Sequence, residues 1–374
     1  MSMIKTIWGF LFRLFPCPTA LGLRRIGNPG RDSPVLVTCN FDLTVKRMRK
    51  ALRGIDAWLL VAESKGVNVW CAAGAREFNT DSVVSAVKTS GIESLVDHRT
   101  LILPPLGAPG IRAADVAERT GWKTVWGPVR LEDIPRFLSA RLVRSEDMKR
   151  ATWNWKERLD TALGSLFPFY FAGALLLAFL GRSLLLEYLV VGAVVFVFFM
   201  LACPWIPTQH GLTKALVVCA VLGGGLAAAR AVSAPLPAWL PSAVWIAMVL
   251  VVIYGTELGG LASTLASDLD PFLARLGIGA VGNVALAGTV RTELLNGYRL
   301  LTHTRERCDR CHGCIEVCPQ RVWEVGRDDE RSVFAHPEWC TACTACLMQC
   351  RSGAIQAHRV RAQAGARAPA LRTG

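Results

Sequence analysis

Long apolar runs occupy the middle of the chain, separated by short breaks that contain charged residues or proline. The runs cover approximately residues 165–180, 184–203, 212–229, 243–261 and 273–290. A helix needs about 20 mainly apolar residues to cross a membrane, and each run approaches that length. The pattern predicts an α-helical transmembrane bundle of four to five helices over residues 161–292. We expect four full spans, with the last, glycine- and alanine-rich run in the interface or re-entering.

Shorter apolar segments alternate with helical patterns between residues 31 and 141. Strands are predicted at 35–38, 57–62, 67–70, 101–103 and 124–126, and helices at 42–52 and 112–120. Alternation of this kind is typical of α/β domains. We therefore expect a Rossmann-like α/β domain over residues 33–160. The preceding segment, residues 1–32, begins with an apolar run that predicts an interfacial or buried helix.

Eight of the thirteen cysteines form two groups near the C-terminus. Each group has the spacing Cys-x2-Cys-x2-Cys-x3-Cys of bacterial ferredoxins, in which the fourth cysteine of each group ligates the other cluster. The predicted ligands are Cys308, Cys311, Cys314 and Cys350 for cluster 1 and Cys340, Cys343, Cys346 and Cys318 for cluster 2.

These two groups predict an α+β bacterial-type ferredoxin domain with two [4Fe-4S] clusters over residues 300–358, and hence a role in electron transfer. Structural zinc is the alternative, but zinc usually takes two pairs of ligands and not two quartets. The remaining residues, 359–374, are rich in alanine and arginine and are expected to form a disordered basic tail.

The net charge of +13 arises from 42 Lys and Arg against 29 Asp and Glu. Many of the basic residues flank the apolar runs, as they do at the cytoplasmic ends of membrane helices. Clustered thiolates also indicate a reducing compartment. We therefore expect a multi-pass protein of the cell membrane with both soluble domains facing the cytoplasm. No helix-turn-helix or base-stacking signature accompanies the charge, so nucleic acid is not an expected partner.

A second candidate site lies where a predicted strand ends, in the run Asn68-Val69-Trp70-Cys71-Ala72-Ala73-Gly74. The small residues of this run could begin a helix, and a helix N-terminus favours thiolate over thiol. Small neighbours also allow a large flat ligand to approach the backbone. A lone cysteine beside a tryptophan is usually a buried packing residue, so these residues alone favour packing over ligation or catalysis.

Residues 33–160 resemble the corrinoid-binding domain of the mercury-methylating corrinoid proteins, which are relatives of the corrinoid iron-sulfur protein of the acetyl-CoA pathway. The resemblance lies in residues 33–38, 68–74, 98–104, 106–110 and 127–130, and residues 68–74 carry the most specific motif. The apolar region that follows is also similar to that family. The C-terminal module resembles the family's separate partner ferredoxin, so the chain resembles a fusion of the two partners.

The resemblance implies a cap helix over a cobalamin-type corrinoid, with Cys71 as the lower axial ligand to cobalt and the catalytic residue. The implied corrinoid contacts are Asn68, Val69, Trp70, Cys71, Ala72, Ala73, Gly74 and Thr38. The implied reaction moves a methyl group from a folate- or pterin-type donor to mercury(II). Cobalt is then reduced by the fused clusters, which themselves require a low-potential electron donor.

Two stretches depart from the family's pattern. Residues 75–80 replace the lysine and the Gly-Thr-Phe-Gly-Thr-like run that commonly follow the motif, and Arg76 is the nearest substitute for the missing charge. The tail, residues 358–374, lacks the cysteine pair thought to deliver mercury. A corrinoid methyl carrier for a non-mercury acceptor is therefore one alternative. The other is a membrane-bound iron-sulfur electron-transfer protein without methyl chemistry.

Overall fold

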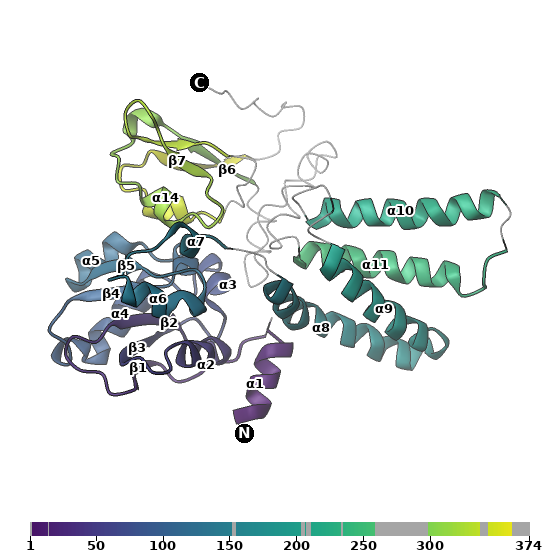
Figure 1. The fold of residues 1–374 in the computed structure, drawn as a ribbon, viewed down its shortest axis with the longest axis horizontal. Helices are drawn as coiled ribbons and strands as arrows, with labels where there is room; N and C mark the ends of the chain where they lie inside the picture. Colours follow the sequence, from purple (N-terminus) through teal and green to yellow (C-terminus); the bar gives the residue numbers. More distant parts are fainter. Residues whose placement is uncertain are drawn as a thin grey trace. The chain divides into compact units, whose positions relative to one another are not determined.

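The computed structural model describes residues 2–13, 15–151, 155–202, 206, 211–232, 235–258, 298–336 and 343–360. The chain divides into two compact units (Figure 1). The first unit comprises Met1–Phe169 and Thr302–Gln356, and the second comprises Tyr170–Leu301 and Ala357–Gly374. The α/β domain and the cysteine-rich module thus belong to one unit.

A five-stranded sheet in the order β1-β3-β2-β4-β5 forms the centre of the α/β domain (Figure 1). Its strands are β1 (Gly22–Ile26), β2 (Val35–Cys39), β3 (Ala57–Ala62), β4 (Thr100–Leu103) and β5 (Lys123–Trp126). Strands β2 to β5 are parallel, whereas β1 pairs antiparallel with β3 at the edge. The strand order reverses between β2 and β4, and α/β sheets bind ligands at the carboxyl ends of the strands beside such a switch point.

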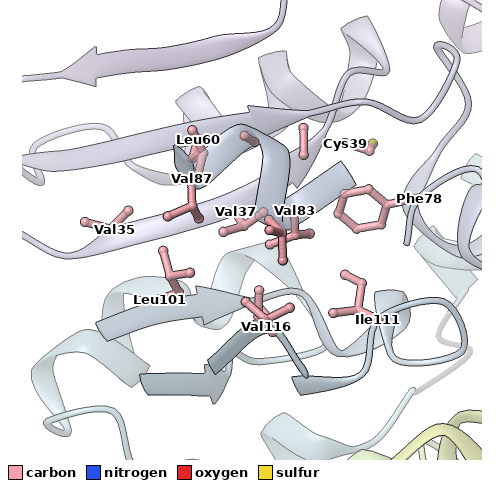
Figure 2. Close-up of a cluster of buried hydrophobic side chains, with 14 of the residues drawn as sticks. Val35, Val37, Cys39, Leu60, Phe78, Val83, Val87, Leu101, Ile111 and Val116 are labelled. Carbon is pink, nitrogen blue, oxygen red and sulfur yellow. The ribbon is translucent and has the colours of Figure 1, made fainter. Parts of the chain in front are cut away.

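Helices cover both faces of this sheet: α2 (Asp42–Ala51), α4 (Thr80–Ser90), α5 (Ala113–Thr120) and α6 (Ile134–Ser139). On one face, Val37 and Leu101 pack with Val83 of α4 and Val116 of α5 (Figure 2). The opposite face packs against α2 and α6, with a separate buried cluster of Leu36, Val45, Met48, Leu52, Leu59, Val61, Ile102, Ile134 and Phe137. The inner strands β2, β3 and β4 are mainly apolar, as is typical of strands whose two faces are both covered.

The predicted α/β domain is confirmed, but two details of the prediction are wrong. The strand expected over residues 67–70 is absent, because the side chain of Asn68 accepts a hydrogen bond from the Cys71 amide at 3.1 Å and so begins the helix α3 (Val69–Gly74). The domain also begins before residue 33, since β1 belongs to its sheet. Strand β1 was not predicted, because Arg24 and Arg25 interrupt the apolar pattern of this edge strand.

The predicted N-terminal helix is present as α1 (Ser2–Leu11). Lys46 of α2 donates a hydrogen bond to Thr6 at 2.5 Å, and Met3 and Ile4 are exposed. After the short helix α7 (Glu146–Lys149), the long helix α8 (Trp155–Leu180) begins in the same unit.

The cysteine-rich module has the α+β architecture expected of a ferredoxin. It contains β6 (Tyr298–His303), α14 (Gly313–Val317), β7 (Trp323–Val325), β8 (Ser332–Phe334), α15 (Ala345–Gln349) and β9 (Ile355–Val360). Strand β6 pairs with β9, and β7 with β8. His312 and Thr344 occupy the same position in the two cysteine groups, and both are left-handed, with φ of 55° and 65°. The module is therefore an internal repeat in which each cysteine group leads into a short helix.

The described helices of the second unit are the end of α8 together with α9 (Arg182–Ala202), α10 (Gly211–Ala231) and α11 (Leu240–Leu258). Here the Tyr188 hydroxyl donates a hydrogen bond to the Tyr170 carbonyl oxygen at 3.1 Å. A Cβ added at Gly192 would lie 2.4 Å from the Tyr170 ring. The glycine thus allows α8 and α9 to approach closely.

The predicted transmembrane bundle and the multi-pass membrane location are wrong. Among the described residues, one helical segment, Lys214–Ala231, is long and apolar enough to cross a membrane, and a single segment of this kind is weak support. Tyr170–Leu180 and Leu240–Tyr254 are apolar but shorter. In helix α8, for example, the apolar stretch is Tyr170–Leu180, which is shorter than the predicted run at 165–180. The run at 273–290 and the tail after residue 360 lie outside the described residues.

Gly110 provides a test of this fold, because a Cβ at this position would lie 2.2 Å from the Phe78 carbonyl oxygen and 3.0 Å from that of Ala73. We expect Gly110→Ala to destabilise the protein by about 1–3 kcal/mol, as overpacking does, and to accelerate amide hydrogen exchange in residues 69–78. Gly30→Ala is the control, since a Cβ there meets nothing within 4 Å. Equal exchange in the two variants would contradict the close contact.

Candidate functional site

Four of the predicted cluster ligands line one small cavity in the ferredoxin module. They are Cys308, Cys311, Cys314 and Cys350. The first three belong to the loop before α14 and to α14 itself, whereas Cys350 directly follows α15. The structure therefore brings together the ligand set predicted for cluster 1, including the cysteine from the other group.

The thiols of this set suit an iron-sulfur cluster. Burial raises the pKa of Cys314 to about 11, and it also raises the pKa of Cys311. Such thiols become ligands when a bound metal displaces their protons. The Ile355 amide donates a hydrogen bond to the Cys350 sulfur at 3.4 Å, and hydrogen bonds to sulfur are one means by which proteins tune cluster potential. The four thiols surround a cavity, and among the described residues no three His, Cys, Asp or Glu side chains are placed to hold a single metal ion.

The second predicted ligand set is described in part, because Cys340 lies outside the described residues. Cys318 follows α14, Cys343 precedes α15, and Cys346 lies on α15. The Val322 amide donates a hydrogen bond to the Cys318 sulfur at 3.4 Å, which matches the environment of Cys350. Helices α14 and α15 pack against each other, so these ligands lie in adjoining parts of the module.

The ferredoxin module packs directly onto the α/β domain. Val317 and Ala345 belong to the same buried cluster as the strand residues Val37 and Leu103, and Cys343 packs against that cluster. These contacts continue the hydrophobic core of the α/β domain into the module.

Gln349 makes the most complete polar contact of this interface. Its side-chain amide donates hydrogen bonds to the carbonyl oxygens of Ala108 and Ile111, at 3.1 and 2.8 Å, and its oxygen accepts one from the Ala113 amide at 3.2 Å. The residue is 9% exposed. It therefore holds the module against the loop that follows β4, at the carboxyl edge of the sheet.

A buried arginine makes a second polar contact between the α/β domain and the ferredoxin module. The Arg144 side chain is 3% exposed and forms an ion pair with Glu316 of α14. It also donates hydrogen bonds to the carbonyl oxygens of Gly127, at 3.1 Å, and Glu316, at 2.7 Å. Sequence reasoning missed both Arg144 and Gln349, because neither lies in a motif and each has its partners far away along the chain.

Cys71 lies at the third position of α3, beyond the carboxyl end of β3, and is half-buried. The loop that leads to α3 is fixed by Asn40, whose oxygen accepts hydrogen bonds from the Ser64 hydroxyl at 2.7 Å and from the Gly66 amide at 2.9 Å. The Asn68 cap then fixes the backbone of Cys71 itself. The helix is only six residues long, so its dipole offers limited support to a thiolate.

The predicted corrinoid contacts fall into two groups. Asn68, Val69, Trp70, Cys71 and Gly74 are half-buried, whereas Ala72, Ala73 and Thr38 are 0%, 1% and 2% exposed. Ala73 lies against Gly110 of the loop after β4, so its small side chain serves internal packing. Val69, Trp70 and Cys71 are thus the consecutive partly exposed residues of α3, although Val69 also packs against the buried core.

Backbone conformation and burial define the roles of Arg76 and Cys39. Arg76 has φ of 61° and follows the end of α3, so it lies outside the helix. It therefore cannot take the place of a lysine that would continue α3. Cys39 of β2 is wholly buried, and burial raises the pKa of its thiol. Cys39 is thus a packing residue.

Two parts of the chain match protein-family models. Residues 15–138 match the family described as CO dehydrogenase/acetyl-CoA synthase delta subunit. Residues 300–351 match the family described as 4Fe-4S dicluster domain. The two matches fall on different parts of the chain, one on the α/β domain and the other on the cysteine-rich module.

Curated relatives agree with the first match. The acetyl-CoA decarbonylase/synthase complex subunit gamma of Methanopyrus kandleri is 36% identical over 129 residues, which cover 34% of this chain and 28% of the relative. The Archaeoglobus fulgidus subunit is 36% identical over 116 residues, covering 30% and 24%, and the Methanocaldococcus jannaschii subunit is 31% identical over 143 residues, covering 38% and 28%. The chain thus spans about a quarter of the length of these relatives. The α/β domain is thus similar to part of these gamma subunits, and the narrower resemblance to mercury-methylating proteins stays a prediction.

Gln349→Glu tests the interface, because a carboxylate would face the carbonyl oxygens of Ala108 and Ile111 without a proton to donate. Each buried polar group left unpaired costs about 1–3 kcal/mol. We expect faster amide exchange in residues 105–113 and faster proteolysis of the module. Gln320→Glu is the matched control, since Gln320 is half-buried on the same module and its side chain makes no hydrogen bond to the described residues. Similar exchange in the two variants would exclude the proposed contact.

Proposed function

We propose that this chain is a corrinoid-dependent methyl-transfer protein whose own ferredoxin module keeps the cofactor reduced. The single observation that carries the proposal is the docking of the iron-sulfur module, through Gln349, on the loop that also packs against α3. The relatives are named as subunits of an acetyl-CoA decarbonylase/synthase complex, which agrees with methyl-group chemistry.

In this proposal Cys71 would be a ligand to the cobalt of a corrinoid, and α3 would hold the cofactor. A bound corrinoid would supply a cobalt ion that carries a methyl group from a donor to an acceptor. The Cys71 thiolate would donate electron density to that metal and so favour transfer of the methyl group. Asn68 holds the backbone of Cys71, and Val69 and Trp70 offer the half-buried apolar surface beside it.

The ferredoxin module supplies electrons for reduction of the cofactor before each new methyl group is accepted. We propose two [4Fe-4S] clusters, one held by Cys308, Cys311, Cys314 and Cys350 and the other by Cys318, Cys340, Cys343 and Cys346. The methyl donor is of folate or pterin type, and mercury(II) is the acceptor that the resemblance to the mercury-methylating proteins implies. A non-mercury acceptor is the alternative, because the tail carries no cysteine pair.

Metal analysis tests the cluster assignment. Anaerobically purified protein should contain about eight iron and eight sulfide per chain, as two four-iron clusters require. Cys314→Ala and Cys346→Ala should each lower the iron content, because each removes a different cluster's ligand. Cys219→Ala, which changes a buried thiol in α10, should leave it unchanged. About two zinc ions in place of iron would refute the assignment.

The visible spectrum tests the corrinoid assignment. After reconstitution with a cobalamin, the protein should show a corrinoid band that shifts in Cys71→Ala, because the thiolate ligand is lost, and that is unchanged in Cys219→Ala. Cluster absorbance without any corrinoid band would support electron transfer without methyl chemistry. A corrinoid band that is identical in all three proteins would exclude Cys71 as the ligand.

The acceptor is tested separately with the reconstituted, methylated protein. Incubation with inorganic mercury(II) should yield methylmercury in the wild type and on the order of a hundredth as much or less in Cys71→Ala, if the ligand contributes several kcal/mol to the barrier. Formation of methylcobalamin without transfer to mercury would favour the non-mercury acceptor.

A further inference from the structure

A buried serine lines the cavity of cluster 1 without being one of the predicted ligands. Ser332 begins β8 and is 1% exposed, yet its hydroxyl oxygen makes no hydrogen bond to any described residue. Among the described residues, four other buried side-chain atoms share this condition, and none of them lines the cavity. A buried polar group without a partner is costly, so we expect the contents of the cavity to supply the acceptor.

The register of β8 places Ser332 on the inward face of the strand. Ser332 and Phe334 alternate with Val333, so they lie on the same face. Phe334 packs against Trp323 of β7, with ring centroids 4.7 Å apart, and Trp323 contacts His303, which lines the cavity. Aromatic rings thus occupy this side of the hairpin. Ser332 is a small polar residue where packing alone would favour an apolar one.

Other polar side chains around the cavity already have partners. Their contacts are those of Asp309 with the Cys311 amide, at 3.2 Å, of His312 with the Glu330 carbonyl oxygen, at 2.7 Å, and of the Ser352 hydroxyl with the Cys350 sulfur, at 3.7 Å. The His303 ring meets the Trp323 ring edge to face. In the described part of the cavity wall, Ser332 therefore carries the hydroxyl that lacks a partner.

The nearby acceptor for this hydroxyl is the sulfur of Cys314. Burial raises the pKa of the Cys314 thiol, and the Ser332 hydroxyl opposes this rise because it stabilises the thiolate. A neutral thiol is a weak acceptor, whereas the thiolates and sulfides of a cluster are negatively charged and accept hydrogen bonds readily. Ser332 is therefore placed to interact with charge that Cys314 carries as a ligand.

The internal repeat of the module has a leucine at the position that corresponds to Ser332. The fourth cysteine of each group accepts a backbone amide hydrogen bond at 3.4 Å, so these donors are common to both groups. Ser332 precedes the second cysteine group by the same number of residues as Leu300 precedes the first, and a leucine side chain has no donor. The serine hydroxyl thus distinguishes the two halves of the repeat, whereas the amides do not.

We infer that the Ser332 hydroxyl donates a hydrogen bond to cluster 1, at the Cys314 sulfur or a sulfide beside it, and thereby raises the reduction potential of this cluster. Reduction adds one electron and takes the cluster from the 2+ to the 1+ state, with no proton transferred. The added negative charge strengthens the hydrogen bond, so the hydroxyl stabilises the reduced form more than the oxidised form. The inference rests on the clusters of the proposed function and not on its methyl-transfer chemistry.

The potential is tested with Ser332→Ala, which removes only the hydroxyl oxygen. Redox titration of the full chain, followed by electron paramagnetic resonance, should show two one-electron steps. In the variant the cluster 1 step should shift about tenfold toward the oxidised form, a fall of about 59 mV for one electron. The cluster 2 step should stay in place, and Cys311→Ser, which changes a cluster 1 ligand, identifies the steps. An unchanged or raised potential of cluster 1 would overturn the inference.

Two further variants separate the hydrogen bond from a general effect on the module. Ser332→Thr keeps the hydroxyl and should return the cluster 1 potential toward the wild-type value. Thr302→Val is the matched control, because it removes a hydroxyl from an exposed residue of β6 that does not line the cavity. It should move neither step. A fall in Thr302→Val as large as that in Ser332→Ala would overturn the inference.

Electron–nuclear double resonance of reduced cluster 1 reports the hydrogen bond directly. Spectra in H2O and D2O should show one exchangeable-proton coupling in the wild type that is missing in Ser332→Ala, while the couplings of backbone amides remain. Identical exchangeable couplings in the two proteins would overturn the inference.

A second pair of variants applies if iron analysis shows that Ser332→Ala has lost its clusters. Ser332→Thr and Ser332→Val have nearly the same shape, and only threonine carries the hydroxyl, so the cluster 1 potential must be higher in the threonine variant. Equal potentials in this pair would overturn the inference alone. A wild-type protein without iron-sulfur clusters would refute the cluster assignment of the proposed function as well.

Discussion

The loop after β4 is the element on which the arrangement of both candidate sites depends. On one side Gly110 approaches α3 so closely that no side chain fits between them, and on the other side Gln349 satisfies the carbonyl groups of Ala108 and Ile111. A buried carbonyl without a partner is costly, so this loop keeps its place only while both neighbours are present. The helix that carries Cys71 and the module that carries the clusters thereby share one support.

The interface beneath the module resembles a domain core more than a transient contact. Val317 and Ala345 extend the apolar cluster of the sheet, and Arg144 is almost wholly buried against Glu316. The neighbouring ion pair between Arg321 and Glu146, at 3.1 Å, is exposed and adds little. Because module and domain belong to one chain, their association is intramolecular and does not depend on the concentration of a separate ferredoxin.

The predictions that failed did so because composition does not identify what a side chain contacts. The apolar runs of the middle region indicated a membrane bundle, yet the apolar stretches Tyr170–Leu180 and Leu240–Tyr254 are shorter than a membrane crossing requires. The small residues Ala72 and Ala73 looked suited to a flat ligand, yet they are buried within the domain. In both cases the residue type agreed with the expected role, but the sequence did not show the tertiary structure around those residues.

The sequence by itself determined the α/β alternation and the two cysteine groups, because strand periodicity and ligand spacing are local properties of the chain. It also pointed to residues 68–74, where the Asn68 cap acts over three residues. Only the tertiary structure decided that Gln349 binds Ala113 across 236 positions and that Arg144 binds Glu316 across 172. Contacts of such separation leave no local pattern, because the fold alone brings the partners together.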